Sequence, residues 1–161
     1  MNFILAEYLP LAIFLIVALV ISCLFILANF LPYQLSILAS GISKDFSKEY
    51  NSRFCLSNAE WRIIAHLSQE TENISIREIY QKVDLEKSKV SRAVSKLAKR
   101  QLLSKKVNLS DKRLVDLKLT KVGREIIDEM TEIAIDFEAR IIQKIENPVS
   151  FKNTINALLK D

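Results

Sequence analysis

The residues of this sequence that could take part in chemistry are mainly lysines and arginines, and they gather in one stretch. From Lys82 to Arg113 the chain carries eleven basic and three acidic residues, whereas residues 121–161 carry six basic and eight acidic residues. Basic side chains bind phosphate and other anions through charge and hydrogen bonds. A run of charge is also typical of a solvated surface, so its meaning depends on the elements that present it.

Groups that enzymes and metal sites use are scarce. The chain has one histidine, His66, and two cysteines, Cys23 and Cys55. Two cysteines cannot form a disulfide framework or a four-thiolate zinc site, and no glycine-rich phosphate loop is present. We therefore predict no catalytic residue, no cofactor and no metal, and we expect that the protein is not an enzyme. We interpret Cys55 as structural, with a thiol sensor as the alternative, and His66 as an ordinary helix residue.

Three short helices are predicted around the start of the basic stretch. A capping box, Ser57-x-x-Glu60, opens a helix that should end near residue 68, and a second, Ser75-x-x-Glu78, opens a helix to about residue 83. The third helix is expected over residues 86–101, with an apolar stripe at spacings of three and four. The core residues expected on the first of these helices are Trp61, Ile64, Ala65 and Leu67.

A change of period marks a hairpin after the third helix. Apolar residues alternate with polar ones over residues 115–119, which predicts a half-buried strand. Residues 103–109 are a plausible partner strand, and residues 110–113 form an all-polar tip. A long helix is then expected over residues 121–145, and a last helix follows Asn147-Pro148.

Helices followed by a basic helix and a hairpin have the order of a winged helix-turn-helix, a DNA-binding fold. The basic helix would bury Val90, Val94 and Leu97 and turn its other face to the major groove. Arg92 can make a bidentate contact to guanine, and the lysines are better suited to phosphates. The predicted DNA contacts are Ser88, Lys89, Ser91, Arg92 and Lys96 on the recognition helix and Lys105, Lys106, Asp111, Lys112 and Arg113 on the wing.

From Leu31 to the C-terminus the sequence resembles the MarR family of bacterial transcriptional regulators. The resemblance is carried by residues 56–62, by residues 87–94, and by Asp111-Lys112-Arg113 followed by Leu119-Thr120-x-x-Gly123-Arg124. It implies that Arg113 enters the minor groove and that Asp111 braces it. Two positions depart from the family pattern: Gln101 replaces the usual glycine before the wing, and Lys89 replaces a small hydroxyl residue.

The resemblance also implies a homodimer that binds a pseudo-palindromic operator and a repressor that a small organic effector relieves. We therefore expect a mainly α fold with a small β-hairpin wing, flanked by dimerisation helices. The expected parts are a transmembrane leader (1–31), a first dimerisation helix (32–54), the winged helix-turn-helix (55–120) and C-terminal dimerisation helices (121–161).

The leader is predicted from residues 11–31, which are uncharged and lie between Pro10 and Pro32. As a helix they would span about 31 Å, close to the hydrocarbon thickness of a bilayer. A buried helix or a cleaved secretory signal are the alternatives, but the segment has no polar face and no basic residue before it. Because the nearby basic residues all follow the span, the DNA-binding domain would lie in the cytoplasm, tethered to the inner membrane.

Met1–Ala18 resembles the first membrane segment of one of the small membrane subunits of NADH–quinone oxidoreductase. This suggests a gene fusion or a start codon assigned too far upstream, in which case the protein would be fully cytoplasmic. Two alternatives to a DNA-binding regulator follow from the leader. One is a membrane-tethered winged helix that contacts only other proteins, and the other is a small membrane component of an electron-transfer chain.

Overall fold

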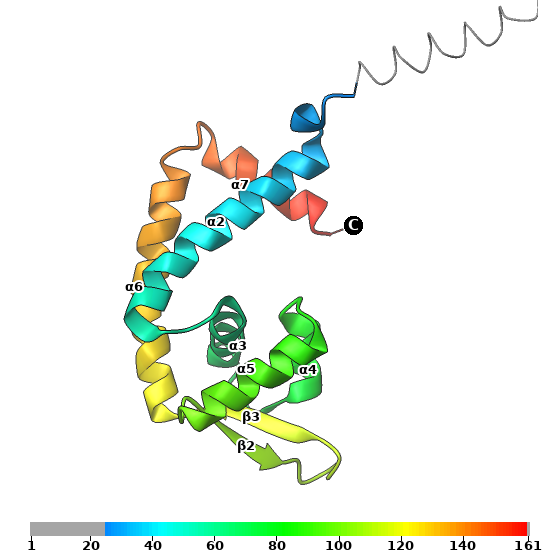
Figure 1. Ribbon diagram of the computed structural model, residues 1–161, viewed down its shortest axis with the longest axis vertical. Helices are drawn as coiled ribbons and strands as arrows, with labels where there is room; N and C mark the ends of the chain where they lie inside the picture. The colour runs from blue at the N-terminus through cyan, green and yellow to red at the C-terminus, as the bar shows by residue number, and fades with distance from the viewer. Residues whose placement is uncertain (1–24, 161) are drawn as a thin grey trace, which may run out of the picture. The chain divides into compact units, whose positions relative to one another are not determined.

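The computed structural model describes residues 25–160. Within α2 the chain separates between Lys44 and Asp45 into two units, and each is described by itself. The described part is mainly helical with a small sheet, as predicted (Figure 1). Its elements are η1 (Leu27–Asn29), α2 (Leu31–Phe54), α3 (Asn58–Ser68), β1 (Ile74–Ser75), α4 (Ile76–Lys82), α5 (Lys87–Lys99), β2 (Leu103–Val107), β3 (Val115–Leu119), α6 (Lys121–Ile142) and α7 (Pro148–Leu158).

The predicted membrane helix falls largely outside the described residues, since residues 11–24 are not among them. Its last part is not α-helical, because Ile26 and Phe30 are extended on either side of the short 3-10 helix η1. Pro32 lies in the first turn of α2, where its missing N–H is no loss, so a new helix begins there. A single helix through residue 31 is therefore wrong for residues 25–30. Between residues 25 and 160 no helix combines the length and the hydropathy that a membrane span needs.

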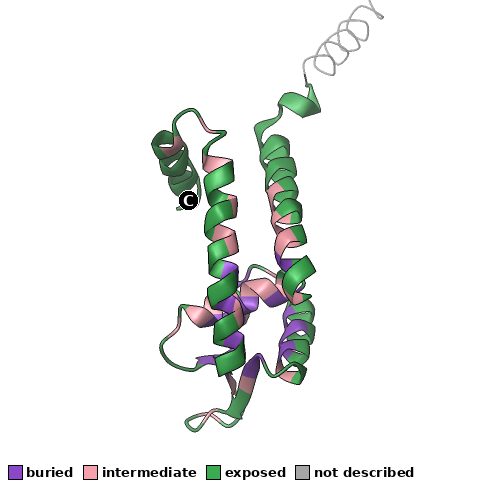
Figure 2. Cartoon of the chain, turned by 90° about the vertical axis from the view of Figure 1, so that its left-hand side faces the viewer, coloured by how far each residue is buried: buried purple, intermediate pink, exposed green. Residues whose placement is uncertain are grey.

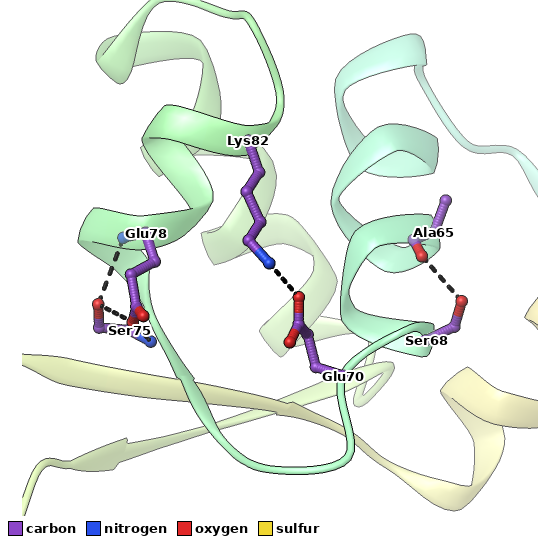
Figure 3. Close-up of polar contacts among 6 residues, drawn as sticks. All are labelled: Ala65, Ser68, Glu70, Ser75, Glu78 and Lys82. Atoms are coloured by element: carbon purple, nitrogen blue, oxygen red, sulfur yellow. Dashed lines mark hydrogen bonds and ion pairs between the residues drawn. The ribbon is translucent and has the colours of Figure 1, made fainter.

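Both predicted capping boxes are present at the starts of α3 and α4. Ser57 Oγ accepts from the Glu60 N–H at 3.3 Å, and the Glu60 carboxylate accepts from the Ser57 N–H at 2.7 Å. Ser75 and Glu78 repeat this arrangement at 3.3 Å and 2.8 Å (Figure 3). The hydrogen bonds from Ser75 lower the pKa of Glu78. These reciprocal bonds satisfy helix N–H groups that have no partner inside the helix.

An ion pair fastens the segment between α3 and β1 to α4. Lys82, in the last turn of α4, is bonded to Glu70, which lies two residues after the end of α3 (Figure 3). At the end of α3, Ser68 Oγ donates to the Ala65 carbonyl at 2.8 Å. The segment that leads into the sheet is therefore held at both ends.

The sheet has three antiparallel strands in the order β1-β3-β2. The two-residue strand β1, which pairs Ile74 with Leu117, was not predicted, because two residues are too short to show an alternation. The predicted hairpin is confirmed, with Leu103 opposite Leu119 and Val107 opposite Val115. Strand β2 ends at Val107 rather than at residue 109, because the side chain of Asn108 closes the turn.

Buried residues gather between α3, α5, the sheet and the first half of α6 (Figure 2). On α3 the buried apolar residues are Ile63, Ile64 and Leu67. Ile63 was not expected in the core, whereas Trp61 and Ala65 were, and both of these are only half-buried. Trp61 instead covers the edge of the core, with its ring centroid 5.3 Å from that of Phe46. Deep burial on α3 is shifted by one position because the helix packs on α5, α6 and β3 together.

The junction between α5 and β2 forms a tight turn without glycine. Gln101 has φ 58°, its N–H donates to the Ala98 carbonyl, and the Leu102 N–H donates to the Leu97 carbonyl, each at 3.0 Å. These are the bonds of a Schellman motif, which usually places glycine at the residue with positive φ. Leu97 and Leu102 are both buried and supply the apolar contact of the motif. The departure at Gln101 therefore leaves the junction geometry intact.

The first turn of α6 packs closely against that junction. Thr120 caps α6 by accepting from the Gly123 N–H at 3.0 Å, and its hydroxyl donates to the Gln101 carbonyl at 2.7 Å. The Thr120 N–H donates to the Leu102 carbonyl at 3.2 Å. A Cβ at Gly123 would lie only 2.0 Å from that same carbonyl oxygen, so this position requires glycine. The Thr120-x-x-Gly123 pattern thus fixes α6 to the base of the wing.

The last two helices leave the core. α6 ends at Ile142 rather than at residue 145, because the following amides bond in tighter turns: Lys144 N–H to the Ile141 carbonyl and Ile145 N–H to the Ile142 carbonyl. Asn147 caps α7, accepting from the Ser150 N–H at 3.0 Å, and Pro148 occupies its first turn. Apart from Pro148, every residue of α7 is exposed (Figure 2).

Candidate nucleic-acid interface

Helix α5 has one apolar face and one basic face. Val90, Ala93, Val94 and Leu97 are buried in the core. All five predicted recognition residues are exposed, and they are Ser88, Lys89, Ser91, Arg92 and Lys96. The helix therefore holds its polar side chains on one surface, as a helix that reads the major groove must.

Two of these side chains already have partners. The Ser91 hydroxyl is hydrogen-bonded to the Tyr80 hydroxyl at 2.8 Å, which ties α5 to α4. Arg92 Nε donates to the Ser88 carbonyl at 3.2 Å, so the guanidinium lies back along the helix. Tyr80 was not recognised from the sequence, because no local pattern pairs it with a residue eleven positions away.

A shallow groove of about 240 Å³ separates α5 from the start of α3. Its α5 side is lined by Lys89, Arg92 and Lys96, which follow one another at helical spacing, and its α3 side by Ser57 and Ala59. Three cations on one wall make the groove electropositive. A nucleic-acid phosphate is the kind of group that such a wall attracts.

The wing continues this basic surface. Lys105, Lys106, Lys112 and Arg113 are all exposed, and Asp111 is half-buried. Lys105 Nζ lies 3.5 Å from Ser95 Oγ of α5, so the base of the wing and the recognition helix share one surface. In Figure 1 the β2–β3 hairpin carries its tip beyond α4 and α5.

The tip of the wing, residues 108–114, is organised by Asn108. The Asn108 side-chain oxygen accepts from the Ser110 and Asp111 N–H groups at 2.8 and 2.9 Å. Its amide nitrogen donates to both Asp116 oxygens at 2.9 and 3.0 Å. Neither Asn108 nor Asp116 was singled out from the sequence, although an asparagine that opens a polar tip is a known signal for a side-chain-closed turn.

Arg113 and Asp111 form a bidentate pair at the tip. Arg113 Nε and Nη2 donate to the two Asp111 oxygens at 3.0 and 3.1 Å, and the Arg113 N–H donates to the same carboxylate at 3.0 Å. These bonds lower the pKa of Asp111 and raise the pKa of Arg113, so both groups stay charged. The Arg113 side chain is 90% exposed, so the pair holds an arginine in open solvent.

Some basic residues of the stretch serve the fold instead. Arg100 donates to the Cys55 and Phe54 carbonyls at 3.1 and 2.7 Å and so caps the end of α2. Cys55 ends α2 with φ 51°, and its thiol is exposed. Among residues 25–160 there is no group of three or more histidine, cysteine or carboxylate side chains that could hold a metal ion.

Comparisons with known proteins agree with this geometry. A model of the family described as transcriptional regulator SarA/Rot matches residues 45–130. Among solved structures, a MarR/EmrR family transcriptional regulator from Acinetobacter sp. ADP1 is 28% identical, with a TM-score of 0.73 over 84% of this chain and 94% of that one. None of the curated proteins matches the sequence.

Two further solved structures are similar. A MarR family regulator from Silicibacter pomeroyi is 26% identical, with a TM-score of 0.68 over 83% of this chain and 90% of that one. BpsR from Bordetella bronchiseptica is 18% identical, with a TM-score of 0.75 over 84% of this chain and 95% of that one, and shares the fold. These relatives are regulators of transcription and not enzymes. With more than half of its 161 residues matched by the family model, the chain belongs to the SarA/Rot family of transcriptional regulators, which has the winged helix-turn-helix fold of MarR regulators.

Proposed function

We propose that the protein is a repressor that binds a pseudo-palindromic operator as a homodimer and is released from it by a small organic effector. The observation that carries the DNA-binding part is the exposed, bidentate-held Arg113 at the tip of a basic wing. An arginine with its side chain ordered in advance loses less entropy when it enters a groove. We assign minor-groove contact to Arg113 and the bracing role to Asp111.

On the recognition helix we assign base contact to Arg92, with Ser88, Lys89 and Ser91 beside it. The Arg92 side chain bonds to its own helix and to no other element, so it is free to turn toward a base edge. Ser91 keeps one hydrogen-bonding position while bonded to Tyr80. The positions proposed for phosphate contact are Lys96, Lys105, Lys106 and Lys112.

Dimerisation is proposed for the flanking helices, which expose apolar residues that a monomer would leave in water. α7 is exposed along its length and carries Val149, Phe151, Ile155 and Leu158. In the first unit, the described residues 25–44 expose their own apolar set, which includes Leu31, Leu35 and Leu38. We therefore expect residues 44–161 to form a weaker dimer than residues 29–161, as measured by sedimentation.

Effector relief is supported by a cavity of about 430 Å³ between the last turns of α2 and the second half of α6. A charged ring surrounds it, formed by Glu49, Arg53, Glu132, Asp136 and Arg140, with Glu49 and Arg140 joined as an ion pair. A polar or ionised small molecule fits such a lining better than an apolar one. The DNA binding of BpsR is regulated by 6-hydroxynicotinic acid, which is a precedent within the fold.

Gel-shift titrations of variants test the DNA-binding assignments. Arg113→Ala should weaken operator binding more than alanine at any single wing lysine, because it removes both charge and the ordered minor-groove contact. Arg92→Ala should cost about 1–3 kcal/mol and relax discrimination at one base pair. Unchanged affinity for Arg113→Ala would refute the role of the wing tip, and equal weakening on all sequences for Arg92→Ala would make it a phosphate contact.

A further inference from the structure

A large apolar side chain stands fully in solvent at the tip of the wing. Leu109 is 98% exposed, more than any other large apolar side chain among residues 25–160, where the next is Leu159 at 78%. Most of the others lie on the flanking helices, where burial in a dimer would account for them. Leu109 lies instead among the basic residues of the wing, so a dimer face does not explain it.

The backbone around Leu109 keeps the side chain outward. Asn108, just before it, accepts from the N–H groups of Ser110 and Asp111, just after it. The same Asn108 is anchored to Asp116 of β3, and its N–H donates to the Leu114 carbonyl at 3.0 Å. Leu109 therefore sits on a closed, cross-braced turn and cannot fold down onto the hairpin without breaking these bonds.

The neighbours of Leu109 show what it would meet. Arg113, on the same seven-residue tip, is held by Asp111 in a position open to solvent, and Lys112 beside it is also exposed. A cationic tip is attracted to phosphate-lined grooves, and the minor groove is narrow with apolar deoxyribose walls. Leucine is one of the side chains that proteins insert between base steps from the minor groove, which opens the step and bends the duplex.

We propose that Leu109 is an apolar wedge that enters the DNA minor groove beside Arg113, packs on the sugars and one base step, and bends the operator. This inference rests on the proposed DNA-binding function. Since pyrimidine–purine steps such as TA open most easily, Leu109 would also give the protein a preference for such a step beneath each wing. The readout comes from shape and apolar contact and not from charge.

The test uses the full chain and short duplexes that carry its best operator, with either TA or GC at the step beneath the wing. Affinity is measured by fluorescence anisotropy over a salt series, and the bend by energy transfer between dyes at the duplex ends. Leu109→Ser removes the apolar group, Leu109→Met keeps it, and Lys112→Ala removes a neighbouring charge from the same loop. Because Leu109 is exposed, Leu109→Ser should melt at the parent temperature.

Leu109→Ser should bind the TA duplex about tenfold more weakly, bend it less and lose the preference for TA, with an unchanged salt slope. Leu109→Met should behave like the parent. Lys112→Ala should instead lower the salt slope by about one and leave the bend as it was. If Leu109→Ser kept the affinity and bend of a parent that binds DNA, the wedge would be refuted and the proposed function would stand.

Two other outcomes also overturn the inference. Weaker binding of Leu109→Ser with an unchanged bend would mean a simple surface contact and no wedge. A parent protein that binds no duplex at all would remove the proposed function and the wedge together.

Discussion

Replacing Gly123 by alanine tests the junction that joins α5, the wing and α6. The added Cβ would lie 2.0 Å from the Leu102 carbonyl oxygen and 3.0 Å from its carbon. Relief of that contact requires α6 or the junction to move by roughly 1 Å, since non-bonded heavy atoms settle beyond 3 Å. The same carbonyl accepts the Thr120 N–H at 3.2 Å, so the movement also weakens the bond that holds the start of α6.

The expected magnitude follows from these two losses. Overpacking of this kind costs about 1–3 kcal/mol, and a weakened hydrogen bond adds about 1 kcal/mol. Alanine recovers about 0.5–1 kcal/mol over glycine within a helix. The net prediction is a loss of roughly 2 kcal/mol in the free energy of unfolding, which opposes the gain that helix propensity alone would give.

Urea denaturation followed by the fluorescence of Trp61, the single tryptophan, measures this change. Gly41→Ala is the matched control, because a Cβ at Gly41 meets nothing within 4 Å and lies within helix α2. That variant should be about 0.5–1 kcal/mol more stable than the parent. If Gly123→Ala were as stable as Gly41→Ala, the close approach of α6 to the junction would be refuted.

Four further predictions concern single side chains. Gln101→Gly should stabilise the protein by about 1 kcal/mol in urea denaturation, because glycine adopts the positive φ of that residue without strain; a loss of stability would contradict the assignment of strain there. Tyr50→Phe should also raise the free energy of unfolding, by about 1 kcal/mol, because the buried Tyr50 hydroxyl has no partner among the described residues and burial raises its pKa; destabilisation would reveal a hidden partner. Asn108→Ala should weaken operator binding less than Arg113→Ala in gel shifts, since it loosens the wing tip but keeps the contacting arginine. Because hydrogen bonds from Arg113 lower the pKa of Asp111, the pair should persist from pH 8 to pH 5 and be lost only below about pH 4, which NMR titration of the Arg113 Nε–H would show.

Local signals in the sequence were enough to predict the elements. The two capping boxes located the starts of α3 and α4, because their bonds join residues only three positions apart. The alternation over residues 115–119 located β3, and the apolar stripe of α5 identified its buried face. Since the exposed face of α5 is the complement of that stripe, all five recognition residues could be predicted to be exposed.

Features that depend on distant partners could not be predicted in this way. The Tyr80–Ser91 bond and the capping of α2 by Arg100 join separate helices, so no spacing in the sequence reveals them. Strand β1 is defined only by its pairing with β3. Gln101 was noted as a departure, but its left-handed conformation is imposed by the Schellman bonds. The membrane span over residues 11–24 stays a prediction, since those residues lie outside the described part of the chain.

Selection of duplexes from a random DNA library by the full-length protein is the most direct test of the central claim. If the protein reads DNA as a symmetric winged-helix dimer, the enriched sequences should be inverted repeats, with half-sites spaced by about one helical turn, roughly 10–10.5 base pairs, or a multiple of it. Binding to them should weaken steeply as salt rises, because the exposed lysines and arginines of α5 and the wing displace counterions. A library that shows no enrichment, or binding that salt does not weaken, would contradict the assignment of this surface to DNA.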